Sequence, residues 1–205
     1  ITIPTFYNYE KLQITKAICK NKNIKCSIEE SVKYRFYPTP RLQIKGLKIE
    51  GFAQNKRNLI SSEDASIKLS FKNLLAKEKH KFKKIVLHNF KAKLDLKNFK
   101  IYKNILSSKI NSNPIIFQKG KISFYDEKKY VVSIYDANIK GKFLDNYNNL
   151  KINGKFLNDD IFINLKSINF DSKASTDLVI KMEKLNYFTK INFSDLDNDK
   201  KKNRR

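Results

Sequence analysis

Apolar and polar residues alternate with a period of two from about residue 24 onward, and this pattern restricts the chain to β structure. Successive side chains of a strand point to opposite faces of a sheet, so strict alternation places the apolar residues on one face. Lys91 and Lys93, for example, lie between Phe90, Ala92 and Leu94. The sequence therefore predicts strands with one apolar face and one solvated, Lys-rich face.

Breaks in the alternation divide the pattern into strands. The apolar set slips by one residue near Gly46 and again near Asn89, and such slips are typical of β-bulges. Pro38 and Pro40 predict a turn, and residues 117–135 predict a hairpin. We expect about nine to eleven strands, mostly antiparallel, and a sheet of that many strands curls, closes or splits.

The chain is mainly β and forms one domain in this interpretation. Residues 6–20 predict a short amphipathic helix, and the strands follow over about residues 24–193. We therefore expect a single β-rich domain over residues 1–194, with a short N-terminal helix and a long, groove-like sheet that has one apolar face. Residues 195–205 are a charged tail that we expect to be disordered.

The composition argues against catalysis and cofactor binding. The 205 residues include 2 Cys, 2 His and 5 Gly, too few for a Cys-rich zinc fold, a His-based centre or a glycine-rich phosphate loop. Two carboxylate pairs, Asp126 with Glu127 and Asp159 with Asp160, stand beside turn residues, where Asp commonly bonds to the backbone. We therefore predict no enzyme, no metal and no cofactor.

The net charge of +23 admits several interpretations. A basic protein attracts nucleic acid and acidic membranes, but Arg, the better reader of phosphates and bases, is scarce among the basic residues. A chain rich in Lys, Asn and Ile is also what an AT-rich genome encodes. Residues 79–103 concentrate the charge, and there Lys79, Lys81, Lys83 and Lys84 either meet anionic headgroups or form a solvated loop.

Three blocks of sequence together resemble the AsmA family of Gram-negative bacteria. The first is the predicted helix followed by residues 34–49, in which a strand ends at a proline turn and an alternating strand follows. The second is the strand and Leu-Leu turn of residues 65–75, followed by the strand of residues 85–90. The third is the hairpin with Gly, aromatic residues and Asp in residues 120–139. The resemblance covers roughly residues 7–165.

Two departures from the family pattern accompany this resemblance. Asn21 and Asn23 stand where the family usually has Thr-Gly, and the membrane-spanning helix with which family members begin is not in this chain. We expect that anchor upstream of residue 1, with residues 1–205 an N-terminal periplasmic portion.

The resemblance implies a β-rich domain in the periplasm, attached to the inner membrane and acting in outer-membrane assembly or lipid homeostasis. Relatives are thought to form curved sheets whose apolar groove carries phospholipid. On this basis phospholipid is the expected partner. A covered hydrophobic core is the alternative for the same side chains. The candidate lipid-contacting residues are Leu42, Ile44, Leu47, Ile49, Ile67, Leu69, Phe71, Leu87, Phe90 and Leu94.

Cys19 and Cys26 are seven residues apart, at the end of the predicted helix and in the first strand. In an oxidising periplasm they could pair, and otherwise they are buried free thiols.

Two further functions remain open from the sequence. One is a basic β protein that binds nucleic acid, which needs aromatic residues on the Lys-rich face, whereas most Phe residues alternate with Lys and so lie opposite it. Nucleic acid is therefore an unlikely partner. The other is a structural fragment without a ligand of its own.

Overall fold

The computed structural model describes residues 10–19, 25–50, 58–69, 82–99, 101–102, 115–144, 146–170 and 173–194. It contains one α-helix, one 3-10 helix and eleven strands within these ranges. Their bounds are α1 Lys11–Ile18, β1 Lys25–Ile28, β2 Val32–Arg35, β3 Arg41–Glu50, β4 Asn58–Leu69, β5 Phe82–Asp95, η1 Leu96–Asn98, β6 Ile115–Asp126, β7 Lys129–Leu144, β8 Tyr147–Phe156, β9 Asp159–Phe170, β10 Lys173–Met182 and β11 Tyr187–Ser194.

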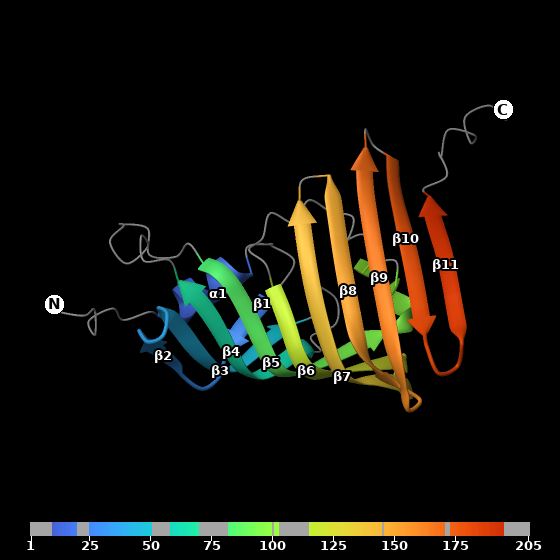
Figure 1. The fold of residues 1–205 in the computed structure, drawn as a ribbon. Coiled ribbons are helices and arrows are strands. Elements are labelled where there is room, and N and C mark those ends of the chain that lie inside the picture. Colours follow the sequence, from blue (N-terminus) through green and yellow to red (C-terminus); the bar gives the residue numbers. More distant parts are fainter. Residues whose placement is uncertain are drawn as a thin grey trace, which may run out of the picture.

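All eleven strands belong to one sheet, which curves strongly from β2 and β3 at one end to β11 at the other (Figure 1). The order of the strands is β1-β3-β4-β5-β6-β7-β8-β9-β10-β11, and β2 pairs with β3 on the same edge as β1. Neighbouring strands are antiparallel except β5 and β6, which are parallel. Among the described residues, β11 does not pair with β1 or β2, so the sheet is open.

The predicted fold class is confirmed: the protein is mainly β, with one short N-terminal helix before a long, mostly antiparallel sheet. The α-helix is shorter than residues 6–20, because α1 begins at Lys11 and ends at Ile18. The pairing of β5 with β6 departs from the expected hairpin connections. A parallel pair needs a crossover, which here takes the chain from the end of β5 to the start of β6. The tail at 195–205 lies outside the described residues.

A line of residues with positive φ angles crosses the middle of the sheet at the predicted slips. Gly46 on β3 and Asn89 on β5 have φ angles of 68° and 50°, and the register places both beside Glu63 of β4. Lys119 on β6 and Asp136 on β7 continue the line with φ angles of 52° and 48°. Lys119 and Asp136 lie at register shifts between β6 and β7, as β-bulges do. The bulges predicted at Gly46 and Asn89 do not shift the pairing with β4, whose register continues unchanged past both residues. The apolar set stays on the same face on both sides of the slips.

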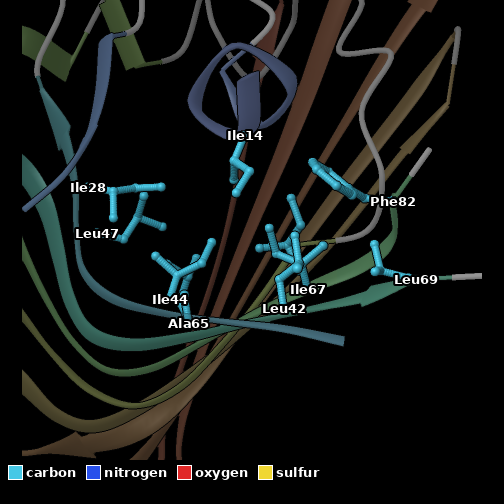
Figure 2. Packing of buried hydrophobic residues seen from close by; sticks show 11 residues of the cluster. Ile14, Ile28, Leu42, Ile44, Leu47, Ala65, Ile67, Leu69 and Phe82 are labelled. Atoms are coloured by element: carbon cyan, nitrogen blue, oxygen red, sulfur yellow. The ribbon is translucent and has the colours of Figure 1, made fainter. Parts of the chain in front are cut away.

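The two faces of the sheet are therefore chemically distinct, and we call them the inner and outer faces. The inner face carries the apolar side chains, and α1 lies against it. Figure 2 shows Ile14 of α1 pointing toward Ile28, Leu47 and the side chains of β3 and β4. Ile14 has no exposed surface, and it completes a cluster that runs from β1 to β5. This cluster is the core of the covered half.

A second cluster continues on the inner face toward the C-terminal strands. Phe90 on β5 belongs to it, with its ring centroid 5.2 Å from that of Phe117 in an edge-on arrangement. Phe117 packs against both clusters, so the apolar surface is continuous from β1 to β10. The closely packed Phe90 ring leaves no space for a side chain at position 120, because a Cβ there would lie 2.2 Å from its Cδ1 atom.

We expect Gly120→Ala to destabilise the protein by about 1–3 kcal/mol, the usual cost of overpacking a core. The buried Phe90 ring would have to move. The matched control is Gly141→Ala, whose Cβ would meet the half-exposed ring of Phe143. That ring is able to rotate away, so we expect a change within about 0.5 kcal/mol. Urea unfolding of both variants measures the difference, and equal losses would contradict this packing argument.

Candidate functional site

The N-terminal half of the inner face is closed by the chain itself. Most of the predicted lipid-contacting residues lie in this half or next to Phe90, and they are core residues with at most 4% of their surface exposed. A ligand could reach those under α1 only by displacing the helix. The buried ones are Leu42, Ile44, Leu47, Ile67, Leu69, Leu87 and Phe90. Their burial favours the alternative of a covered core, which the sequence left open beside a lipid groove.

The remaining predicted site residues are more dispersed. Ile49 and Leu94 are half-buried on β3 and β5, and Leu94 packs against the second cluster. Lys83 is exposed and Lys84 is half-buried at the start of β5. Phe71, Lys79 and Lys81 lie outside the described residues.

Cys19 and Cys26 form a disulfide, with their Cα atoms 6.1 Å apart. The bond joins the residue after α1 to β1, where Cys26 pairs with Ile49 of β3. The helix is thus fixed to the sheet both by the packing of Ile14 and by a covalent link. The sequence left open a disulfide or two buried free thiols, and the structure contains the disulfide.

A different part of the inner face carries half-exposed apolar side chains. On β8, β9 and β10 the register aligns three rows across the strands, which we call the C-terminal apolar rows. No residue of α1 belongs to the cluster that these rows adjoin. Seven of the nine members are half-buried, whereas Ile161 and Met182 are buried. The rows are Leu150–Leu165–Leu178, Ile152–Ile163–Ile180 and Gly154–Ile161–Met182.

Two features border these rows. Phe99, just after η1, lies with its ring centroid 6.3 Å from that of Phe193 on β11. Because β5 and β11 are six places apart in the sheet, this contact spans the concave side. Next to the rows, Asn148, Ser167 and Thr176 form a buried polar row, in which the Thr176 hydroxyl donates to Ser167 Oγ at 3.2 Å. The apolar rows thus have a polar border at one end.

The outer face is polar and contains a hollow of about 490 Å³ over β7 to β10. Lysines, carboxylates and amides line it, among them Asp136, Asn153, Lys155 and Asp160, with the ring of Phe162. Among the described residues, no group of three His, Cys, Asp or Glu side chains has the arrangement of a metal site.

Aromatic side chains also lie on the outer face, on β6 and β7. The Lys121 ammonium lies 4.8 Å from the centroid of the Tyr135 ring. The Tyr130 hydroxyl donates to Ser133 Oγ at 3.1 Å. A hydrogen bond with Tyr130 and the positive charge of Lys121 lower the pKa of Tyr135 below its ordinary value. These two tyrosines thus lie on the same face of the sheet as Lys121 and the other lysines.

A carboxylate on β9 holds two turns together. Asp159 Oδ1 accepts hydrogen bonds from the backbone N–H groups of Asp160 and Lys184, at 2.7 and 3.2 Å. Asp159 Oδ2 accepts one from the N–H of Leu185, at 3.1 Å. Burial alone would raise the pKa of Asp159, but the three donors and the charge of Lys184 outweigh it and lower the pKa. Asp159 therefore has a structural role, as its position beside a turn indicated.

Comparison with known proteins identifies no relative: no family model, curated protein or solved structure matches the chain. The resemblance to the AsmA family thus stays a prediction from the sequence. Among the described residues, no helix has the length and apolar character needed to cross a membrane.

The C-terminal apolar rows were visible in the sequence as strands but not as a site. The alternation that marks Ile152, Ile163 and Ile180 is the same as that of the buried stripe under α1. No local signal shows which part of one apolar face the helix covers, because that depends on the placement of α1 in three dimensions.

We expect Ile14→Ala to cost about 2–5 kcal/mol of stability, the range for truncating a fully buried aliphatic side chain. The effect should appear as faster hydrogen exchange in α1 and β3 and as a lower urea midpoint. Leu12→Ala is the control on the same helix, since Leu12 is 62% exposed. A similar effect of both substitutions would show that α1 does not cover the core.

We expect Asp159→Asn to lower the stability at neutral pH, because the amide replaces a charged acceptor of three hydrogen bonds. A carboxylate whose folded-state pKa is lowered stabilises fully above its unfolded-state pKa, near 3.8, and loses this contribution as pH falls through the folded-state pKa. The difference between wild type and variant should therefore shrink below about pH 4. Thermal unfolding across pH measures it, with the exposed Asp160→Asn as control; a pH-independent difference would contradict the assignment.

Proposed function

We propose that the protein is a non-enzymatic lipid-binding module that holds the acyl chains of a phospholipid against the C-terminal apolar rows. The observation that supports this most is the continuity of one apolar face along the whole sheet. Half of that face is a closed core, and the rest presents half-exposed Leu and Ile side chains on β8 to β10. Contiguous apolar surface of this kind marks ligand or partner sites.

The arrangement suits an amphipathic ligand. Apolar rows run across three strands and supply contact for hydrocarbon, whereas the polar row of Asn148, Ser167 and Thr176 borders them on the same face. The polar row is itself buried, with at most 4% of each residue exposed, so it ends the hydrocarbon contact and the polar end of the ligand lies outside the rows. The site therefore moves from the stripe predicted under α1 to the C-terminal strands.

The resemblance to the AsmA family supplies the cellular part of the proposal. On that basis the module acts in the periplasm, attached to the inner membrane through a segment outside this chain. Its role would be lipid transport in outer-membrane assembly or lipid homeostasis. Both statements rest on the order and spacing of the three sequence blocks.

Binding of single-stranded nucleic acid is the second candidate, supported by the outer-face tyrosines. The Tyr135 ring lies beside Lys121 and its hydroxyl interacts with Tyr130, and stacking on aromatic rings next to cations is how such proteins hold bases. Loss of oligonucleotide affinity in Tyr135→Ala, with lipid binding unchanged, would favour this function over the first.

We expect phospholipid to remain with the purified protein after a wash in about 1 M salt, where the Debye length is about 3 Å. Ile163→Asp should reduce that lipid about tenfold or more, because a carboxylate against hydrocarbon costs well over the ~1.4 kcal/mol that corresponds to a factor of ten. Native mass spectrometry of the protein and of its lipid extract measures the amount.

Asn153→Asp is the matched control, since it adds the same charge to an exposed residue of the neighbouring strand β8, on the outer face. Ile180→Trp tests the site without a charge, because the larger side chain occupies the apolar surface. Lipid-free wild-type protein, or equal loss in Ile163→Asp and Asn153→Asp, would contradict the proposal.

A further inference from the structure

We propose that the outer face of β2 to β5 docks on an anionic lipid bilayer through a ladder of four cations. Arg35 of β2 pairs with Arg41 of β3, Arg41 pairs with Lys68 of β4, and Lys68 pairs with Lys84 of β5. The four side chains thus occupy one row across four neighbouring strands, and we call this row the basic ladder. With strands about 4.8 Å apart, the ladder extends over about 14 Å.

The register places the basic ladder on the outer face. Leu42, Ile67 and Ile85 form the adjacent row, and their side chains belong to the core of the covered half. Their neighbours Arg41, Lys68 and Lys84 therefore point the opposite way. Arg35 and Lys68 are exposed, and Arg41 and Lys84 are half-buried, so all four reach the surface.

Such a row is unfavourable by itself, because like charges directly opposite one another on a sheet repel. A second row of lysines on the same face is balanced: Lys48 pairs with Glu29, and Lys91 lies 3.5 Å from Glu63. Within the described parts of the chain, no carboxylate lies within ion-pair distance of the basic ladder. The ladder consequently presents an unbalanced positive field that an external anionic surface would neutralise.

The residues next to the ladder favour a bilayer over a nucleic acid. The turn between β2 and β3 exposes 84% of Tyr37, and the Arg41 guanidinium holds this turn by donating to the Tyr37 carbonyl at 3.2 Å. A Tyr at the edge of a basic surface is suited to the headgroup region, where its apolar ring and polar tip meet different environments. The ladder itself has no aromatic platform between its cations, as base stacking would require.

This inference does not depend on a lipid in the C-terminal apolar rows. The two surfaces are on opposite faces and on different strands, so a variant can remove one without changing the other. Ile163→Asp should leave vesicle binding intact, and the loss of the basic ladder should leave tightly held lipid intact.

The test is flotation of the 205-residue chain with vesicles of phosphatidylcholine alone or mixed with phosphatidylglycerol. We expect binding only to the mixed vesicles, at about 0.1 M salt but not at about 1 M. Replacing all four ladder residues by Gln should weaken the partition coefficient on the order of 100- to 1,000-fold, since each cation contributes ~1 kcal/mol near an acidic surface.

The matched control removes four charges elsewhere on the outer face, by replacing Lys140, Lys151, Lys166 and Lys190 with Gln. These lysines are exposed on β7, β8, β9 and β11, and their loss should weaken binding far less. A triple variant that keeps Arg41, and with it the bond to the Tyr37 carbonyl, guards against misfolding and should still lose most of the binding. Circular dichroism checks that each variant keeps its strands.

Three results would overturn the proposal. Unchanged vesicle binding in the ladder variants would show that the ladder is not the contact. An equal loss in the ladder and control variants would show that only net charge matters. Loss of single-stranded oligonucleotide binding without loss of vesicle binding would assign the ladder to nucleic acid.

Discussion

The burial of one continuous apolar face is the constraint on which the rest of the structure depends. Every strand from β3 to β10 contributes apolar side chains to the inner face, and a single one-residue slip would turn a strand's apolar set outward. The positive-φ residues Gly46, Asn89, Lys119 and Asp136 accommodate such slips at one level of the sheet. The curvature of the sheet and the separation of an apolar from a Lys-rich face both follow from keeping this alignment.

The sequence was sufficient for the fold class because alternation is a local signal. The slips at Gly46 and Asn89, the turn at Pro38 and Pro40 and the hairpin after Gly120 were all readable from neighbouring residues, and each is present. The parallel pairing of β5 with β6 could not be predicted in this way, because nothing in either strand distinguishes a parallel from an antiparallel neighbour. The pairing depends on how the two strands are placed in the assembled sheet.

The candidate site was less accessible to prediction for a related reason. The alternation of Leu42 and Ile44 and that of Ile163 and Leu165 are equivalent in the sequence, yet the first pair is buried beneath α1 and the second is half-exposed. Among the described residues, the position of Ile14, fixed by its packing and by the Cys19–Cys26 bond, divides the face into two parts. The basic ladder was hidden similarly, because Arg35, Arg41, Lys68 and Lys84 become neighbours only through strand register.

The division of the inner face also explains how one sheet could combine stability with a binding surface. Fully buried side chains under α1 provide hydrophobic stabilisation that does not depend on a ligand, since each buried aliphatic side chain contributes on the order of 2 kcal/mol. The strands from β8 onward are attached to that core through the shared packing of Phe117 and Phe90. They can therefore keep Leu and Ile side chains half-exposed without losing their place in the sheet. The covered half holds the fold, and the less covered half leaves side chains exposed that the proposed lipid binding would use.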